Sequence, residues 1–199
     1  MRLFLILLIL PFVLNATELP VAERPVPGVG DVYEYNFPNA PFRCRRWQIV
    51  ELAHDGMMVS QCGPFRSYQS VVGDYNPVRL SDGGNDLWSF SPYFPGVKFP
   101  LQLVATWNGD YDGFTADMGM HWRGEVSCDV GAFEPVAVPA GTFNAYRIEC
   151  TDQLQSAPSR QPMGVVHSIR WYAPLEEVIA KVWNREDPRW NAELAAIER

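Results

Sequence analysis

The spacing of chain-breaking residues is the feature that most constrains how this chain can fold. Seventeen proline and fifteen glycine residues interrupt it, and the segments between them are short runs rich in Val, Ile, Tyr, Phe and Trp. Such runs, bounded by Gly, Pro, Asn or Asp, are typical of antiparallel strands. The expected strands are residues 32–37, 45–52, 57–62, 67–72, 99–107, 120–128, 133–138, 143–150, 165–172 and 178–183.

These runs predict a mainly β domain: a single antiparallel, strongly curved sheet or a partly open barrel, with a β-sandwich as the alternative. Residues 73–98 are the least regular part of the chain, and "SDGGND" and "FSPYFPG" predict a long loop there. Near the end of the chain, Asp187 can cap a helix that Pro188 opens. Because "RWNAELAAIE" has the composition of a helix, we expect a short C-terminal helix.

The first residues, MRLFLILLILPFVLNA, have the order of a secretory signal: Arg2, an apolar run over residues 3–14, and the small Ala16. This run is too short to cross a bilayer as a helix. We therefore expect residues 1–16 to be a signal peptide that is cleaved near Ala16. Residues 17–199 are then a single β-rich extracytoplasmic domain, periplasmic or secreted, with no transmembrane anchor after processing.

The charge of the expected mature chain argues against two classes of partner. Without Arg2 it has 15 basic and 23 acidic residues, a net charge of −8. Nucleic acids and anionic membrane surfaces are bound by clustered Lys and Arg, which this chain lacks. We expect no nucleic-acid partner.

Four cysteines in an exported chain indicate two disulfides. Cys128 and Cys150 lie symmetrically about Pro139, so folding this stretch back on itself brings them to one face of a hairpin. The same folding predicts three further opposed pairs: Val130 with Ile148, Ala132 with Tyr146, and Val136 with Thr142.

The second disulfide, Cys44 with Cys62, is expected mainly by elimination. A tight turn at Asp55-Gly56 would instead set Cys62 opposite Ile49. Oxidised cysteines in this compartment are structural far more often than catalytic.

The motifs "VPAGTFNAYRIEC", "IRWYAP" and "VIAKVW" resemble a pattern in exported bacterial β-rich proteins of unknown function, a DUF3108-like group. The resemblance extends over most of residues 28–183, and its most specific part is 136–183. Its residues set turns and the core: Pro139 and Gly141 suit a tight connection between strands. The resemblance implies no catalytic residues. "PLEE" stands where the group commonly has a shorter turn that contains glycine.

Catalytic motifs are sparse. The chain has no G-x-S-x-G and no H-E-x-x-H motif, and its three histidines, at 54, 121 and 167, are scattered. We therefore expect no cofactor and no enzymatic activity. A glycosidase-type hydrolase that uses turn aspartates is the remaining enzymatic alternative.

The stretch "WNGDYDGFTADMG", residues 107–119, matches the first positions of a calcium-binding loop. The twelfth position of such a loop supplies a bidentate carboxylate, and here it is Gly119. We therefore expect Asp112-Gly113 to form the tip of a hairpin. A weak surface metal site shared by Asp110, Asp112 and Asp117 is the remaining metal hypothesis.

The chain has seven tryptophans, and several of them lie in expected strands. Trp88 instead lies in the irregular segment, with Tyr93 and Phe94 nearby. If an aromatic cluster binds a ligand, these three residues are the candidates. The leading hypothesis is a non-enzymatic periplasmic domain that binds an envelope protein or a small apolar ligand. The alternative is a protein that binds or cleaves glycan or cell wall with these loop aromatics and aspartates.

Overall fold

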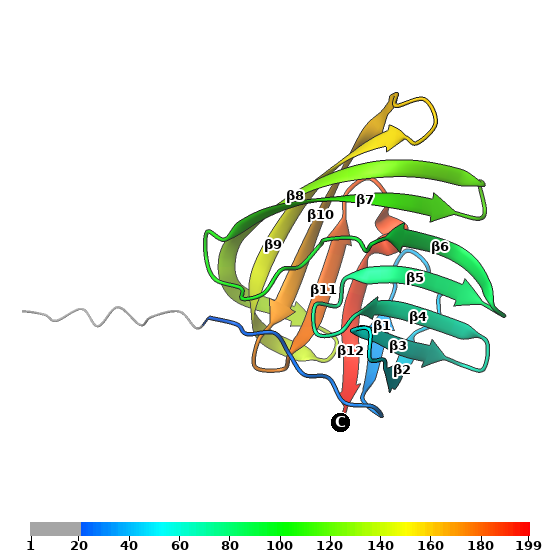
Figure 1. Ribbon diagram of the computed structural model, residues 1–199. Coiled ribbons are helices and arrows are strands. Elements are labelled where there is room, and N and C mark those ends of the chain that lie inside the picture. The colour runs from blue at the N-terminus through cyan, green and yellow to red at the C-terminus, as the bar shows by residue number, and fades with distance from the viewer. Residues whose placement is uncertain (1–20) are drawn as a thin grey trace, which may run out of the picture.

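The computed structural model describes residues 21–199 as a closed barrel of twelve antiparallel strands (Figure 1). Each strand pairs with the next along the chain, and β12 pairs with β1 to close the barrel. The expected mainly β, curved architecture is confirmed, and it closes as a barrel rather than a sandwich. The strands are β1 Val32–Asn36, β2 Arg46–Leu52, β3 Met57–Cys62, β4 Arg66–Val71, β5 Pro77–Asp82, β6 Asn85–Ser91, β7 Thr106–Thr115, β8 Met120–Val138, β9 Gly141–Ser156, β10 Pro162–Ala173, β11 Val178–Asn184 and β12 Ala192–Glu198.

Neighbouring strands run in opposite directions, so the connections between them alternate between the two ends of the barrel. We call one end the mouth; it has the connections 37–45, 63–65, 83–84, 116–119, 157–161 and 185–191. Figure 1 shows its hairpins β3–β4, β5–β6 and β7–β8 at the right. The opposite, plugged end has the connections 53–56, 72–76, 92–105, 139–140 and 174–177, and both termini of the barrel.

The strands alternate between an apolar inner face and a polar outer face. On β9, Tyr146, Ile148 and Cys150 are buried, whereas Arg147 and Glu149 between them point outward and form an ion pair at 2.7 Å. Since side chains alternate along a strand, this parity identifies the inward-facing residues of each neighbouring strand through the pairing register. Among residues 21–199, no helix is long and apolar enough to span a membrane.

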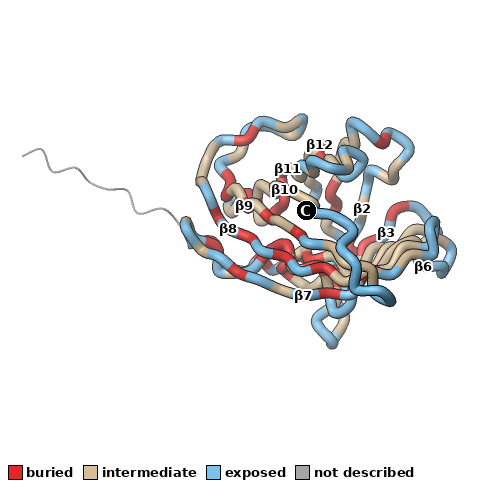
Figure 2. Tube along the Cα trace, turned by 90° about the horizontal axis from the view of Figure 1, so that it is seen from above, coloured by how far each residue is buried: buried red, intermediate tan, exposed pale blue. Residues whose placement is uncertain are grey.

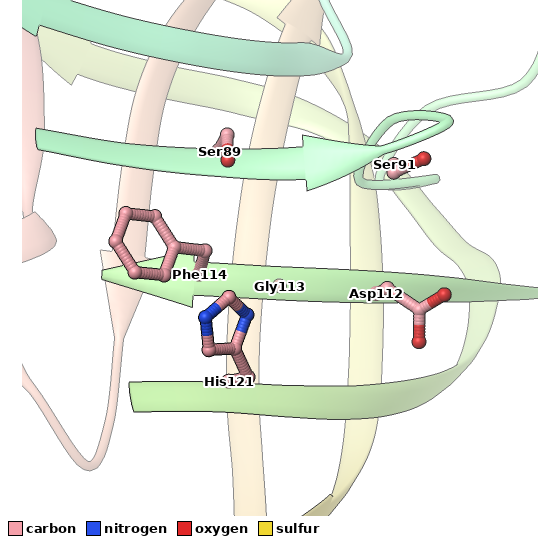
Figure 3. A pocket seen from close by; sticks show the side chains of 6 residues that line it. All are labelled: Ser89, Ser91, Asp112, Gly113, Phe114 and His121. Carbon is pink, nitrogen blue, oxygen red and sulfur yellow. The ribbon is translucent and has the colours of Figure 1, made fainter. Parts of the chain in front are cut away.

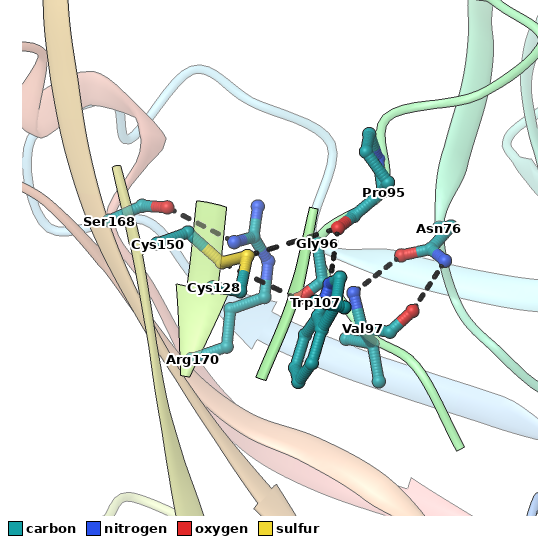
Figure 4. Close-up of a disulfide and its surroundings, with 9 residues drawn as sticks. All are labelled: Asn76, Pro95, Gly96, Val97, Trp107, Cys128, Cys150, Ser168 and Arg170. Carbon is teal, nitrogen blue, oxygen red and sulfur yellow. Dashed lines mark hydrogen bonds between the residues drawn. A yellow bond between two sulfur atoms is a disulfide. The ribbon is translucent and has the colours of Figure 1, made fainter. Parts of the chain in front are cut away.

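Part of the chain between β6 and β7 packs against the inner face of the barrel. We call residues 92–101 the plug, because Phe94, Val97 and Leu101 are buried against the inner faces of β7 to β10. Asn76 fixes it by two hydrogen bonds of 2.8 Å to the backbone of Val97 (Figure 4). The plug fills the plugged end with apolar side chains and gives its backbone polar partners.

The expected C-terminal helix is wrong. Asp187 does cap a helix, but it is the short 3-10 helix Pro188–Trp190. The following residues form β12, in which Leu194 is fully buried. An isolated helix of this length is marginal, whereas the strand pairs with β1 and β11 and completes the barrel.

The irregular segment 73–98 also differs from its expectation, because it contains β5 and β6. Gly83 and Gly84 form the two-residue turn between these strands, and both adopt positive φ. The expected strand 99–107 is largely absent: its first part belongs to the plug, and β7 begins at Thr106. The expected strands 120–128 and 133–138 are one long strand, β8.

Asp112-Gly113 is not a hairpin tip. Both residues lie within β7, where Asp112 pairs with Arg123 and Gly113 pairs with Trp122. The turn lies further along the chain, at residues 116–119. The acidic, glycine-containing stretch is therefore the middle of a strand.

Both expected disulfides are present. Cys128 and Cys150 lie directly opposite each other on β8 and β9, with their Cα atoms 4.1 Å apart. Cys44 pairs with Cys62, and their Cα atoms are 6.1 Å apart. Two disulfides and no free cysteine in residues 21–199 are typical of an extracytoplasmic protein. The expected signal peptide, residues 1–16, lies outside the described residues.

The register of the β8–β9 hairpin follows the expectation only near the disulfide. Val130 pairs with Ile148 as expected, but the pairing shifts by one residue between Val130 and Ala132. Ala132 is therefore opposite Arg147 rather than Tyr146, and Val136 is opposite Phe143. A bulge of this kind cannot be located from alternation alone.

Candidate ligand site inside the barrel

Five aromatic side chains form a continuous layer on the inner face of the barrel. Neighbouring ring centroids are 5.9 Å apart for Trp47–Tyr68 and for Tyr68–Trp88, 5.2 Å for Trp88–Phe90 and 6.2 Å for Phe90–Trp122. These spacings are typical of packed aromatic pairs. We call Trp47, Tyr68, Trp88, Phe90 and Trp122 the aromatic wall.

The strands between those that contribute the wall have smaller inward-facing residues. Ser60 of β3 lies opposite Tyr68, and Gly113 of β7 lies between Phe90 and Trp122. A Cβ atom at Gly113 would come within 2.2 Å of the Trp122 ring, so the ring lies directly on the glycine backbone. Gly113 is therefore required by packing inside the barrel and not by a turn.

The interior is filled unequally. We define the filled half as the buried cluster around the plug, where Leu101, Tyr146 and Ile148 have 0% of their surface exposed. Nearer the mouth, inward-facing residues keep partial exposure, and we call this region the open half. It comprises the aromatic wall together with Leu80 and Leu154. Arg170 of β10, which is paired with the buried Ile148 and contacts Phe94 of the plug, also keeps partial exposure.

Figure 2 shows the same contrast along the chain. Buried segments lie along β7 to β11, whereas β5 and β6 are mostly of intermediate burial. Side chains that point into a closed barrel yet remain partly exposed indicate interior space that water reaches. The inward-facing side chains near the mouth are therefore less completely covered than those of the filled half.

A buried carboxyl group lies at the boundary of the two halves. Asp152 points inward from β9, and its Oδ2 accepts a hydrogen bond of 2.5 Å from the Tyr111 hydroxyl. Trp122 donates to the same hydroxyl oxygen at 3.2 Å. Burial raises the pKa of Asp152 to about 6, although the bond from Tyr111 and the nearby Arg170 act in the opposite direction. Its Oδ1 has no hydrogen-bond partner within the described chain.

A guanidinium group lies close by. Arg170 points inward from β10, and its Nη1 donates to Ser168 at 3.1 Å (Figure 4). Its Cζ lies 4.9 Å from the centre of the Phe94 ring, and a Cβ at Gly96 would approach the same atom to 2.8 Å. Burial lowers the pKa of Arg170 to about 10, so the group stays charged at neutral pH. Among the described residues, Arg170 takes part in no ion pair within 4 Å.

The mouth continues the aromatic wall outward. Trp190 packs on Trp88 with ring centroids 5.8 Å apart, and the guanidinium of Arg43 lies 4.2 Å above the Trp190 ring. Cations over tryptophan faces are favourable contacts. A molecule that enters the open half from the mouth would therefore pass the Arg43 guanidinium and the Trp190 ring.

The structure brings together only two of the three expected ligand-binding residues. Trp88 belongs to the aromatic wall, and Phe94 packs against its member Phe90 at 5.7 Å, but Tyr93 makes none of these ring contacts. The sequence holds a signal for the wall, because Trp88 and Phe90 alternate with polar residues after a Gly-Gly turn.

Asp152 and Arg170 were not among the sequence candidates. Asp152 has the parity of Cys150, two residues away on the same strand, and that parity predicts an inward carboxyl group. For Arg170, the available signal is a strand register: it lies opposite Ile148, which is buried. Strand registers are rarely readable from a single sequence.

The metal hypothesis for Asp110, Asp112 and Asp117 finds no support in the geometry. Asp110 points outward and forms an ion pair with Arg123 at 3.4 Å. Asp117 lies in the turn and accepts a hydrogen bond from Thr115. Within residues 21–199, no group of three His, Cys, Asp or Glu side chains could hold a metal ion.

Asp112 lines a pocket on the outer wall of the barrel together with Ser89, Ser91, Gly113, Phe114 and His121 (Figure 3). The ring of His121 packs on Phe114 at 4.7 Å. Although Ser, His and Asp side chains occur here, no hydrogen bond links them in the described chain, so a nucleophile and its base are not assembled.

Comparisons with known proteins give similarity of fold only. Neither a family model nor a curated protein sequence matches this chain. Two solved structures are similar: a "putative exported protein with YmcC-like fold" from Bacteroides fragilis and a "putative lipoprotein" from Parabacteroides distasonis. Their sequence identities are 13% and 10%, each similarity covers 90% of this chain and 100% of the other, and both TM-scores are 0.46.

Proposed function

We propose that this protein is an extracytoplasmic binding protein without catalytic activity, and that it holds a small amphipathic molecule in the open half of the barrel. The observation that supports it is the partial exposure of the inward-facing side chains in the open half, beside the buried side chains of the filled half. Apolar and aromatic side chains that converge on interior space, with a few polar groups among them, are the usual composition of a small-molecule site.

The arrangement of polar groups favours an amphipathic molecule over a purely apolar one. The aromatic wall offers ring faces and edges to an apolar body, while Asp152 and Arg170 lie at its inner end. Buried polar groups fix the orientation of a ligand, and aromatic surface supplies most of the affinity. Binding would therefore be oriented, with the polar end of the molecule deepest.

The test uses the exported, oxidised protein and the neutral fluorescent probe N-phenyl-1-naphthylamine. We expect saturable binding at one site, because the probe has the flat apolar body that the wall accommodates. Leu154→Trp adds bulk to the open half and should weaken binding at least about tenfold. This corresponds to a loss of ~1.4 kcal/mol or more of binding free energy.

The matched control is Gln153→Trp, which adds the same side chain to the outer face of the same strand. It should leave the dissociation constant within about twofold. If the probe does not bind, or if both variants weaken binding equally, the site is not inside the barrel. In that case an envelope protein bound at the surface becomes the better hypothesis.

A further inference from the structure

We infer that the molecule held in the open half is an organic anion, and that Arg170 binds its carboxylate or sulfonate group. This inference rests on the proposed function and adds the chemical class of the ligand. It begins from Arg170, a charged group that points into the barrel and forms no ion pair within 4 Å in the described chain, although Asp152 lies near enough to interact with it electrostatically.

Charged groups taken from water are normally paired, because an isolated buried charge is costly. Arg170 has one hydrogen bond, from Nη1 to the neutral Ser168 hydroxyl, and it packs on the Phe94 ring. Its guanidinium has five N–H donors in a fixed plane, which match the two oxygens of a carboxylate. The remaining donors and the positive charge suit an incoming anion.

The nearest carboxyl group is already engaged elsewhere. Oδ2 of Asp152 accepts a hydrogen bond of 2.5 Å from the Tyr111 hydroxyl. Asp152 and Arg170 do not come within the 4 Å of an ion pair. The other titratable groups that face Arg170 are the hydroxyls of Tyr111 on β7 and Tyr68 on β4. Both hydroxyls stay neutral at physiological pH, since burial raises the pKa of each well above its ordinary value. Neither tyrosine can neutralise the guanidinium.

Two contacts fix the guanidinium in place before any ligand arrives. The plug holds it on one side, where Gly96 allows the close approach and Phe94 lies beneath it. Arg170 nevertheless keeps partial exposure. A preorganised cation loses little conformational freedom when it binds an anion.

The charge at the two ends of the barrel agrees with an anionic ligand that enters at the mouth. The mouth connections have five arginines and three acidic residues, whereas the connections and termini of the plugged end have three basic and six acidic residues. In a chain that is acidic as a whole, this asymmetry makes the mouth the more favourable approach for an anion. The arginines of the mouth are Arg43, Arg45, Arg160, Arg185 and Arg189.

The experiment compares two probes that share one ring system. 1-Anilinonaphthalene-8-sulfonate has a sulfonate that N-phenyl-1-naphthylamine lacks. The wild-type protein should bind the anionic probe about tenfold more tightly or better, because a hydrogen bond between a guanidinium and an anion is stronger than one between neutral groups. Arg170→Gln should remove this preference and change the dissociation constant of the neutral probe less than about threefold.

Arg123→Gln is the matched control, because Arg123 lies on the outer face of β8 and pairs with Asp110; it should preserve the preference. If the wild-type protein binds the neutral probe but does not prefer the anionic one, the inference fails and the proposed function stands. This comparison needs no variant and so does not depend on the folding of Arg170→Gln. If neither probe binds, the proposed function fails with it.

Discussion

Tyr146 and Trp122 point into the same barrel from adjacent strands, yet Tyr146 has 0% of its surface exposed and Trp122 remains partly exposed. The difference does not come from the strands, which have similar alternation in both halves. The plug accounts for part of it, because Val97 and Leu101 are buried in the filled half, and Phe94 reaches the aromatic wall only at its edge, on Phe90.

The comparison separates stability from binding. In the filled half, side chains from the strands and the plug meet with little exposed surface, as in an ordinary protein core. In the open half, large aromatic side chains line the interior without covering one another completely. Substitutions in the filled half should therefore change the free energy of unfolding, and substitutions in the open half should change binding more than stability.

The largest effect should distinguish the two disulfides. Their sequence separations, 22 and 18 residues, are similar, so chain entropy predicts a loss of about 3 kcal/mol for either one. Replacing Cys128 and Cys150 together by Ala should cost more than this, because Cys150 lies 3.7 Å from the Gly96 carbonyl and supports the plug. Replacing Cys44 and Cys62 should cost about 3 kcal/mol alone. Urea unfolding measures the loss of stability for both double variants. Equal losses would contradict the idea that the Cys128–Cys150 disulfide supports the plug.

A matched pair of leucines tests the same contrast without cross-links. Leu101→Ala, in the plug, should lower the free energy of unfolding by about 3 kcal/mol, the usual result for a fully buried leucine. Leu154→Ala, in the open half, should cost about 1 kcal/mol, since its side chain is only partly buried and packs at the edge of the core. Similar losses for the two variants would show that the open half is as well filled as the other.

A smaller effect is expected from Asp152 at the boundary. Burial raises its pKa to about 6 in the folded protein, above the ordinary value of 3.8, so folding favours the protonated form. Its contribution is fully present below pH 3.8 and is lost as the pH rises through about 6. The free energy of unfolding of Asp152→Asn, measured relative to that of the wild type, should therefore rise by up to about 2 kcal/mol between pH 4 and pH 8.

Denaturant unfolding at the two pH values measures this difference. Asp129→Asn, on the outer face of β8, is the control and should show no comparable pH dependence. A difference between wild type and Asp152→Asn that stays constant from pH 4 to pH 8 would mean that Asp152 is not held in a buried environment.

Much of this architecture could be predicted from the sequence, because it depends on short-range patterns. Alternation and breaker residues indicated strands, and the symmetry of Cys128 and Cys150 about Pro139 predicted a cross-strand disulfide. Errors arose where local preference and tertiary pairing disagree. Residues 192–198 have the composition of a helix, but the barrel needs a last strand to pair with β1. Asp112-Gly113 has the signature of a turn, but Gly113 is the place where the Trp122 ring lies.

The sequence by itself determined the mainly β class, the parity of the buried residues and the two cysteine pairs, since each depends on residues close together in the chain or on a count of four. Only the tertiary structure decided the closure of the barrel, the plug and the meeting of Arg170 with the aromatic wall. These features join residues that are far apart in the sequence, and their free energy comes from packing and long-range pairing. No short-range pattern specifies such contacts.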